Sequence, residues 1–258
     1  MKPVGALSAP GALVRRNDPD RFLAALFAPA RAREALFVLY AFNLELARAC
    51  EATREPHMSL IRLAWWREVV EGAERRHEVA TPLAALLAER RLDRAALLAL
   101  IDARQGEVAP EFPTLADWRA HLFATQGELA ATAGKALGAE AAPALRLFGA
   151  AYGAARLLRS IPALARQGRV LLPADSLAAH GLSPEGPALA AVRARLAAEA
   201  ASWLAEARRS RLPRAALPAA LPAVLAARDL RQASEAEPRP RGLGARLSVL
   251  MAALRGRV

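Results

Sequence analysis

The chain has little of what builds disulfide-linked or zinc-bound proteins. Among its 258 residues there is a single cysteine, Cys50. One cysteine excludes an internal disulfide framework and agrees with a reducing compartment. The histidines stand in separate segments without the spacing of a metal site: His57, His77, His121 and His180. We therefore predict no metal ligand and no histidine acid or base among them.

Long apolar runs are also missing. No uncharged apolar run approaches the roughly 20 residues that a membrane span needs. The first 20 residues lack an apolar core followed by a small-residue cleavage site, so we expect no secretory signal. These absences predict a cytoplasmic protein, either soluble or peripheral on the inner face of the membrane.

What the chain does have is alanine, leucine and arginine. Apolar residues make up 54% of the sequence and the net charge is +11, while lysine stands only at Lys2 and Lys135. Such residues favour helices, so we predict an all-α fold in one large domain. The charge fits an anionic partner such as diphosphate or phospholipid, and a solvated arginine-rich surface explains it equally well. Nucleic acid is not expected, because the charge is spread out and no recognised motif accompanies it.

Apolar periodicity and turn residues mark out the helices. Asp18 before Pro19 has the form of a helix start, and Thr114 with Asp117 resembles a capping box. Pro56 and Pro162 are expected to end helices, the latter opening a loop over 162–175. The predicted helices cover residues 19–27, 30–52, 59–70, 82–90, 93–105, 115–137, 143–161 and 187–211, with shorter helical pieces between the prolines of 213–222.

Three regions follow from this pattern. Residues 1–17 are predicted to be a flexible N-terminus, and residues 18–232 a helical domain. Residues 233–258 are predicted to be a polar linker followed by a basic amphipathic helix. That helix has two equally weighted interpretations, one lying on anionic lipid and the other docked on the domain.

Residues 149–175, GAAYGAARLLRSIPALARQGRVLLPAD, resemble the second signature of the squalene/phytoene synthase family. The matching scaffold positions are Gly149, Leu157, Leu158, Arg159, Gly168, Arg169, Leu172, Pro173 and Asp175. Where the family has metal-binding carboxylates, this chain has Ser160, Ala163 and Leu164. The resemblance therefore implies the fold without the acids.

Residues 39–51, LYAFNLELARACE, resemble the first signature of the same family. Leu39, Tyr40 and Ala41 match, but the two aspartates fall on Ala47 and Glu51. In the family, two such clusters on facing helices hold magnesium against an isoprenoid diphosphate, and helical spacing places each cluster on one face.

The segments AFNLELA, IRLAWWREVVEG and LLRSIP are similar to one branch of the family, that of the mitochondrial respiratory complex I assembly factor and its bacterial relatives. The similarity spans about residues 18–229 and implies an isoprenoid-synthase-like helical bundle around a central cavity. It also implies a non-catalytic role in complex I assembly, a complex I subunit as partner, and no cofactor. Two alternatives stay open. One is a head-to-head prenyl diphosphate synthase that holds Mg²⁺ through Glu45, Glu51 or Asp175; the other is an isoprenoid or lipid carrier without turnover.

The candidate binding residues follow from helical spacing and from the family pattern. Asn43 and Ala47 lie four residues apart on the face that looks into the family's substrate channel, while Glu45 and Arg48 are expected to form a local ion pair. No catalytic residue is predicted. The ligand-binding candidates, for a cavity or an anionic head group, are Asn43, Ala47, Arg48, Glu51, Arg67, Arg159 and Arg169. For Arg67, Arg159 and Arg169, a structural ion pair or a solvated role has equal weight.

Overall fold

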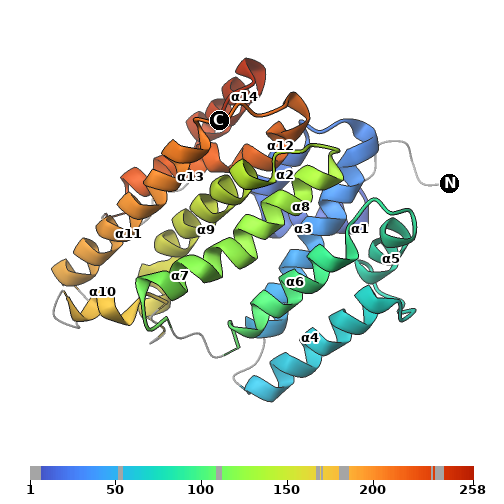
Figure 1. The fold of residues 1–258 in the computed structure, drawn as a ribbon, viewed down its shortest axis with the longest axis horizontal. Helices are drawn as coiled ribbons and strands as arrows, with labels where there is room; N and C mark the ends of the chain where they lie inside the picture. Colours follow the sequence, from blue (N-terminus) through green and yellow to red (C-terminus); the bar gives the residue numbers. More distant parts are fainter. Residues whose placement is uncertain are drawn as a thin grey trace.

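The fold is seen in a computed structural model, which describes residues 7–51, 55–108, 112–166, 169, 171–179, 186–233, 235 and 241–258. In these ranges the regular structure is helical throughout (Figure 1). Gly168, His180 and residues 236–240 of the predicted linker lie outside them.

The first half of the chain contains α1 to α8. Their bounds are α1 Ala9–Asn17, α2 Pro19–Ala25, α3 Ala30–Glu51, α4 Pro56–Glu71, α5 Ala80–Ala88, α6 Arg94–Gln105, α7 Leu115–Leu122 and α8 Glu128–Ala136, with a π-helical segment η1 over Phe123–Gly127 between α7 and α8. The predicted capping box is confirmed, because the Asp117 amide donates to Thr114 Oγ1 at 3.2 Å and the Thr114 amide donates to Asp117 Oδ2 at 3.1 Å.

The second half contains α9 to α14. Their bounds are α9 Ala142–Ala165, α10 Ala174–Ala178, α11 Gly186–Ala207, α12 Leu217–Ala220, α13 Pro222–Arg231 and α14 Leu243–Arg255, with a 3₁₀ turn η2 over Arg214–Ala216. Gly138 follows α8 with φ of 71°, a conformation that suits glycine, and so ends that helix as the sequence predicted.

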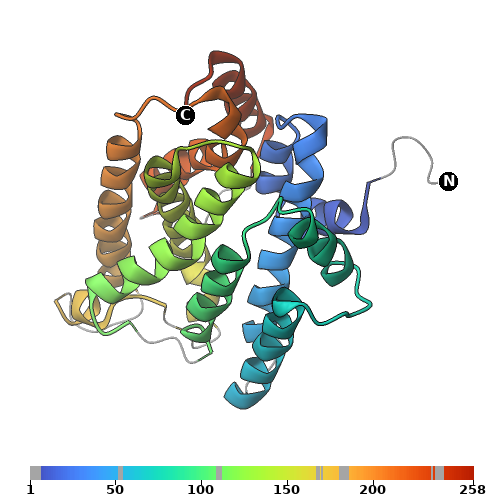
Figure 2. The ribbon, with the colours of Figure 1, turned by 45° about the vertical axis from the view of Figure 1, so that its right-hand side comes forward.

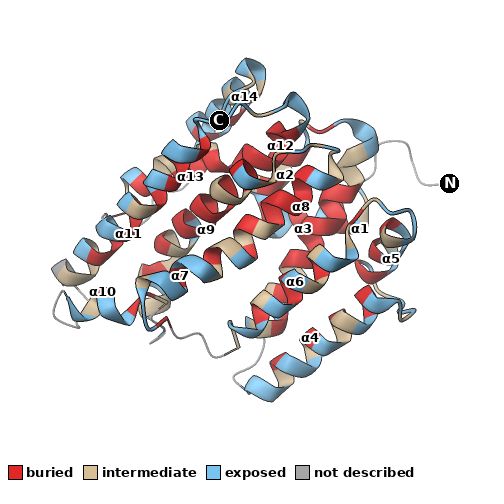
Figure 3. Ribbon diagram, in the orientation of Figure 1, coloured by how far each residue is buried: buried red, intermediate tan, exposed pale blue. Residues whose placement is uncertain are grey.

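Two long helices, α3 and α9, form the centre of the molecule (Figures 1 and 2). Residues 35–43 of α3 and 148–155 of α9 are buried without a break, which requires neighbours on every side. α3 packs against α1, α4, α5, α6 and α8, while α9 packs against α8, η1, α11 and α13. Figure 3 shows buried residues along these two helices and on the helices that pack against them.

Glycines let α9 approach the π-helical segment closely. A Cβ atom added to Gly149 would lie 2.3 Å from the carbonyl oxygen of Gln126 and 2.6 Å from Ala130 Cβ. Gly153, one turn later, would meet Gln126 Cγ at 2.5 Å. The family-like glycine at 149 therefore has a packing reason in this chain.

Three predictions differ from the structure. Residues 9–17, predicted to be flexible, form α1. The Gly11 amide donates to Ser8 Oγ at 3.1 Å, which caps the helix, and the helix buries Leu13 and Val14. Pro56 begins α4, since the first turn of a helix needs no proline N–H. Pro162 lies inside α9, which continues to Ala165, so the expected loop starts later.

α14 packs on α13 and carries the chain back over α2. Among the helices that the structure describes, none is both long enough and apolar enough to cross a membrane.

Candidate functional site

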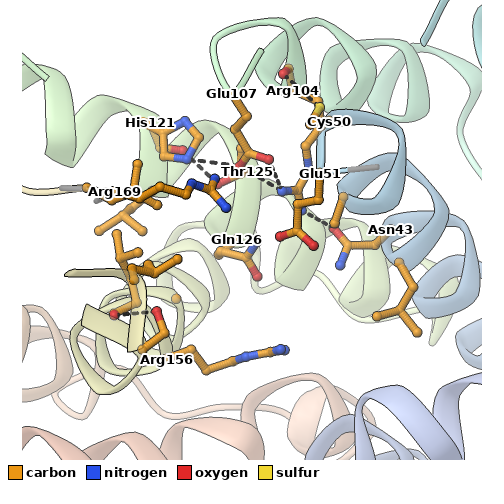
Figure 4. A pocket seen from close by; sticks show the side chains of 18 of the residues that line it. Asn43, Cys50, Glu51, Arg104, Glu107, His121, Thr125, Gln126, Arg156 and Arg169 are labelled. Carbon is orange, nitrogen blue, oxygen red and sulfur yellow. Dashed lines mark hydrogen bonds and ion pairs between the residues drawn. The ribbon is translucent and has the colours of Figure 1, made fainter. Parts of the chain in front are cut away.

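A cavity of about 340 Å³ opens between α3, α6, the α7–η1 segment and α9 (Figure 4). α3 contributes Asn43, Ala47 and Glu51 to its wall, and α9 contributes Ser160 and Leu164. The two sequence segments that resemble the family's signatures therefore face the same space. Ala163, the third position without its acid, is exposed and does not line the cavity.

Arg104 of α6 anchors one polar cluster of the cavity wall. Its Nη2 donates to Asn43 Oδ1 at 2.7 Å, and its Nη1 donates to Glu107 Oε1 at 2.7 Å. His121 Nε2 lies 3.1 Å from the same carboxylate. Burial alone would raise the pKa of Glu107, but the Arg104 guanidinium and the hydrogen bond from His121 lower it to about 2. Glu107 is therefore an ionised carboxylate already bound by Arg104 and His121.

Asp18, the cap of α2, anchors the other cluster. Arg21 and Arg156 donate to its Oδ2 at 2.9 and 2.7 Å, and Arg21 also donates to Gln126 Oε1 at 2.7 Å. The Arg21 guanidinium stacks 4.9 Å from the Tyr152 ring centre. Burial opposes ionisation of Asp18, yet the two guanidinium groups hold its pKa below the usual value. Arg21 and Arg156 thus reach the cavity while both pair with the single carboxylate of Asp18.

The predicted ligand-binding residues divide between the cavity and the outer surface. Asn43, Ala47, Glu51 and Arg169 line the cavity. Arg169 has no ion pair among the residues that the structure describes, and Figure 4 shows its side chain directed toward the middle of the pocket.

The other predicted arginines lie elsewhere. Arg48 pairs with Glu45 at 2.7 Å, as predicted, in a separate pocket beside Trp65 and Trp66. Arg67 pairs with Asp102, outside the cavity.

Arg159 is also turned away from the cavity. It lies 3.5 Å from Asp229 and lines a neighbouring pocket, which shares Arg156 and Ser160 with the cavity.

Sequence reasoning missed most of the polar wall. The residues it did not single out are Arg21, Arg104, Glu107, His121, Gln126 and Arg156. The spacing of Arg104 and Glu107, three residues apart, was available as a signal of a local pair. Nothing local indicated that α6 and α7 would present this pair and His121 to the face of α3.

The cavity does not fit the magnesium ions that the fold family implies. Mg²⁺ takes oxygen ligands in near-octahedral geometry, usually through carboxylates. The side chains at 47, 160 and 164 offer a methyl group, a hydroxyl and an isobutyl group. The carboxylate of Glu107 is bound by Arg104 and His121, and in the described part of the chain no group of three or more His, Cys, Asp or Glu residues is arranged to hold a metal ion. Asp175 is also occupied, since it accepts from the Leu115 amide at 3.0 Å.

A sequence profile of the squalene/phytoene synthase family matches residues 14–251 of the chain. The chain belongs to this family. Among solved structures, a dehydrosqualene synthase superposes with a TM-score of 0.78 at 12% identity, covering 95% of this chain and 94% of that one. The squalene synthase HpnC from Alicyclobacillus acidocaldarius gives 0.69 at 17% identity, covering 96% and 92%. The predicted all-α isoprenoid-synthase-like fold is confirmed.

Curated relatives of this family member carry an assembly-factor name. The human protein named NADH dehydrogenase (ubiquinone) complex I, assembly factor 6 is 28% identical over 70% of this chain and 60% of its own length. The Drosophila melanogaster homolog is 29% identical over 67% and 56%, and the Bos taurus protein 30% identical over 67% and 54%. The chain thus spans little more than half of these relatives' length. The predicted resemblance to the branch that contains the assembly factor is confirmed.

Proposed function

We propose that this chain is a non-catalytic member of the squalene/phytoene synthase family that assists the assembly of respiratory complex I, with a complex I subunit as its partner. The observation that carries the proposal is the meeting of the two signature segments in one cavity where only Glu51 remains of the expected acids. The names of the curated relatives supply the process.

The electrostatics of the cavity support the absence of prenyl transfer. Ionising an allylic diphosphate builds negative charge on the leaving group, which the family stabilises with metal ions held by carboxylates. Here Arg21 and Arg156 share Asp18, and Arg104 is held by Glu107 and Asn43. Each of these three arginines is already paired within the wall, so the cavity offers no carboxylate site for the metal route and no unpaired member of this group for a direct arginine route.

Prenyl transfer is tested by magnesium-dependent release of diphosphate from farnesyl and geranylgeranyl diphosphate. The purified chain is assayed beside a family member with intact aspartates. We expect the control to turn over and this chain to release no diphosphate above the protein-free background. Turnover comparable to the control would overturn the non-catalytic assignment and require a search for substitute metal ligands.

The assembly role is tested in cells by deleting the gene and measuring assembled complex I and its NADH oxidation. We expect both to fall and to be restored by the wild-type gene. The Ala47→Asp variant returns one acid to the cavity. If complex I assembly does not depend on metal binding in the cavity, this variant should restore assembled complex I and its NADH oxidation as the wild-type gene does. Unchanged complex I after deletion would contradict the proposal. We place the protein on the cytoplasmic side of the membrane, where fractionation of the same cells can locate it.

Binding of a lipid without turnover is a second candidate, favoured by the retained cavity. Its wall joins apolar side chains, including Leu44, Leu122 and Leu157, to the cationic end near Arg169. Such a cavity matches an isoprenoid or acyl chain with an anionic head group.

Native mass spectrometry of the purified protein tests this candidate. We expect a bound lipid in the wild type, its loss in Ala47→Phe, which fills the cavity, and its retention in Ala64→Phe, which alters an exposed position of α4. A wild-type protein free of lipid would contradict it.

A further inference from the structure

The helix α14 docks on the protein with its small side chains and turns its large apolar side chains outward. Ala245 and Val249 are each 1% exposed and pack with Ala24, Leu221 and Leu225. The outward residues and their exposed fractions are Leu243 77%, Leu247 57%, Leu250 40%, Met251 42% and Leu254 70%. A helix docked only for the stability of the fold would bury the leucines, because each buried leucine contributes far more than an alanine.

The outward residues form one continuous stripe, which we call the α14 stripe. Positions 243, 247, 250, 251 and 254 recur at three and four residue steps, so they share one face of the helix. The helix has 13 residues and is therefore about 20 Å long.

Positive charge borders the α14 stripe. Arg246, Arg255 and Arg257 are exposed, and the sequence from 241 to 258 contains no aspartate or glutamate. Arg241, just before the helix, is instead held by Asp20 at 2.9 Å and by Asp229 at 2.7 Å. A leucine-rich face flanked by free arginines is complementary to a surface that is apolar inside and negatively charged at its rim.

We infer that α14 is a membrane-surface helix, which inserts the α14 stripe among the acyl chains of an anionic phospholipid leaflet and places its arginines at the level of the head groups. A protein partner is less well matched. Hot spots of protein interfaces are rich in Trp and Tyr and poor in Leu, whereas α14 contains no Trp, Tyr or Phe and its stripe consists mainly of leucines. This inference stands independently of the proposed role in complex I assembly.

Co-sedimentation of the whole chain with lipid vesicles tests the inference. Vesicles of phosphatidylcholine are compared with vesicles in which part of that lipid is replaced by phosphatidylglycerol. We expect binding to the anionic vesicles that is at least about ten-fold tighter than to the neutral ones and that weakens with salt. Absence of binding to the anionic vesicles at low salt would overturn the inference and leave the stripe to a protein partner.

Paired variants assign the binding to α14. Leu247→Ser with Leu254→Ser should weaken binding at least about ten-fold, because each removes apolar surface that would enter the acyl layer. The matched control, Leu60→Ser with Ile61→Ser, removes side chains that are 45% and 58% exposed on α4. α4 and α14 lie at opposite ends of the molecule in both Figures 1 and 2.

The control pair should bind as the wild type does, whereas equal loss in both pairs would contradict a role for α14. Arg246→Gln with Arg255→Gln leaves the apolar stripe intact and should reduce binding to anionic vesicles alone. Unchanged binding by this pair would contradict the head-group contact. Circular dichroism of every variant checks that the helical fold is kept.

Discussion

Glu107 shows how a carboxylate beside a family-like cavity can be unavailable to a metal. Its oxygens are taken by Arg104, and His121 lies 3.1 Å away. The same contacts lower the pKa of Glu107 to about 2 in spite of burial. The Arg104–Glu107 pair links α6 to the last turn of α7 through His121 and to α3 through Asn43, so Glu107 holds the wall of the cavity in place.

Replacing Glu107 with glutamine should destabilise the protein and reduce the acid dependence of its stability. A carboxylate whose folded-state pKa lies below the usual 4.5 stabilises the fold at neutral pH, and this contribution is lost as the pH falls from about 4.5 to about 2. We expect Glu107→Gln to lower the free energy of unfolding by about 3 kcal/mol at pH 7, because it leaves Arg104 unpaired. Urea unfolding at pH 7 and at pH 3 measures both effects, and the variant should differ less from the wild type at pH 3.

Glu89→Gln is the matched control, since Glu89 is 57% exposed and lies 3.4 Å from Arg91. A surface pair of this kind contributes little, so the control should stay within about 0.5 kcal/mol of the wild type at both pH values. An equal loss of unfolding free energy in the two variants would contradict the prediction that the buried pair of Glu107 stabilises the fold more than a surface pair does.

The sequence predicted correctly which residues of α3 share the face that lines the cavity. Asn43, Ala47 and Glu51 recur at four-residue steps on α3, and the structure places them together in the cavity. The sequence did not indicate that Arg67 and Arg159 would lie outside the cavity. The direction of an arginine side chain depends on which acid another helix brings near, and Asp102 and Asp229 come from distant segments. For the same reason Arg104 and His121 were missed.

At the level of the elements, the contact between α9 and the π-helical segment depends on the absence of side chains at two positions of α9. Gly149 and Gly153 face Gln126 across this contact, and the nearest atom to a Cβ at 149 is a backbone oxygen. Backbone cannot move aside as the end of a flexible side chain can. The π-helical segment itself was not predictable, because the apolar pattern of 115–137 is that of a continuous helix.

Gly149→Ala should therefore destabilise the protein even though alanine favours helices. We expect a loss of about 2 kcal/mol, since overpacking of this kind forces the backbones apart. Gly244→Ala in α14 is the control, because a Cβ there meets nothing within 4 Å. It should be neutral or stabilise by up to about 1 kcal/mol. Thermal unfolding followed by circular dichroism measures both, and a neutral Gly149→Ala would contradict the close approach.

Arg241 ties the start of α14 to the body of the protein through Asp20 and Asp229. We expect Arg241→Met to raise amide hydrogen exchange in α14 by at least about ten-fold while α3 is unaffected, because locally opening segments exchange first. The control is Arg75→Met, which removes an exposed pair with Glu68 at 2.7 Å and should leave α14 unchanged. Protection of α14 that is equal in the two variants would contradict the role of Arg241.

At the scale of the whole molecule, the scaffold motifs predicted the fold more fully than the local signals did. The match from Gly149 to Asp175 predicted the bundle and its cavity, although Pro162 was misinterpreted as a break and α4 was expected to begin after Pro56. A proline inside a helix removes one backbone hydrogen bond and crowds the preceding turn, which lowers the local stability of the helix. α9 nevertheless continues past Pro162 to Ala165. The charge inside the cavity was beyond prediction, since it depends on how six separate segments meet.

If the loss of carboxylates is the reason that this cavity does not suit magnesium, restoring them should bring binding back. In Ala47→Asp/Ser160→Asp/Leu164→Asp, acids on α3 and α9 would join Glu51 around the same space. We expect Mg²⁺ to stabilise this variant by about 1.4 kcal/mol at ten times its dissociation constant, and to leave the wild type unchanged. A control with the same added charge on exposed positions, Ala64→Asp/Ala84→Asp/Ala95→Asp, should not respond. Thermal unfolding curves of the wild type and both variants, recorded with Mg²⁺ and with EDTA, measure this stabilisation. A response in the wild type would mean that other oxygens hold the metal, whereas silence in the restored variant would mean that the cluster of Arg21, Arg104 and Arg156 has made the cavity unsuitable for a cation by itself.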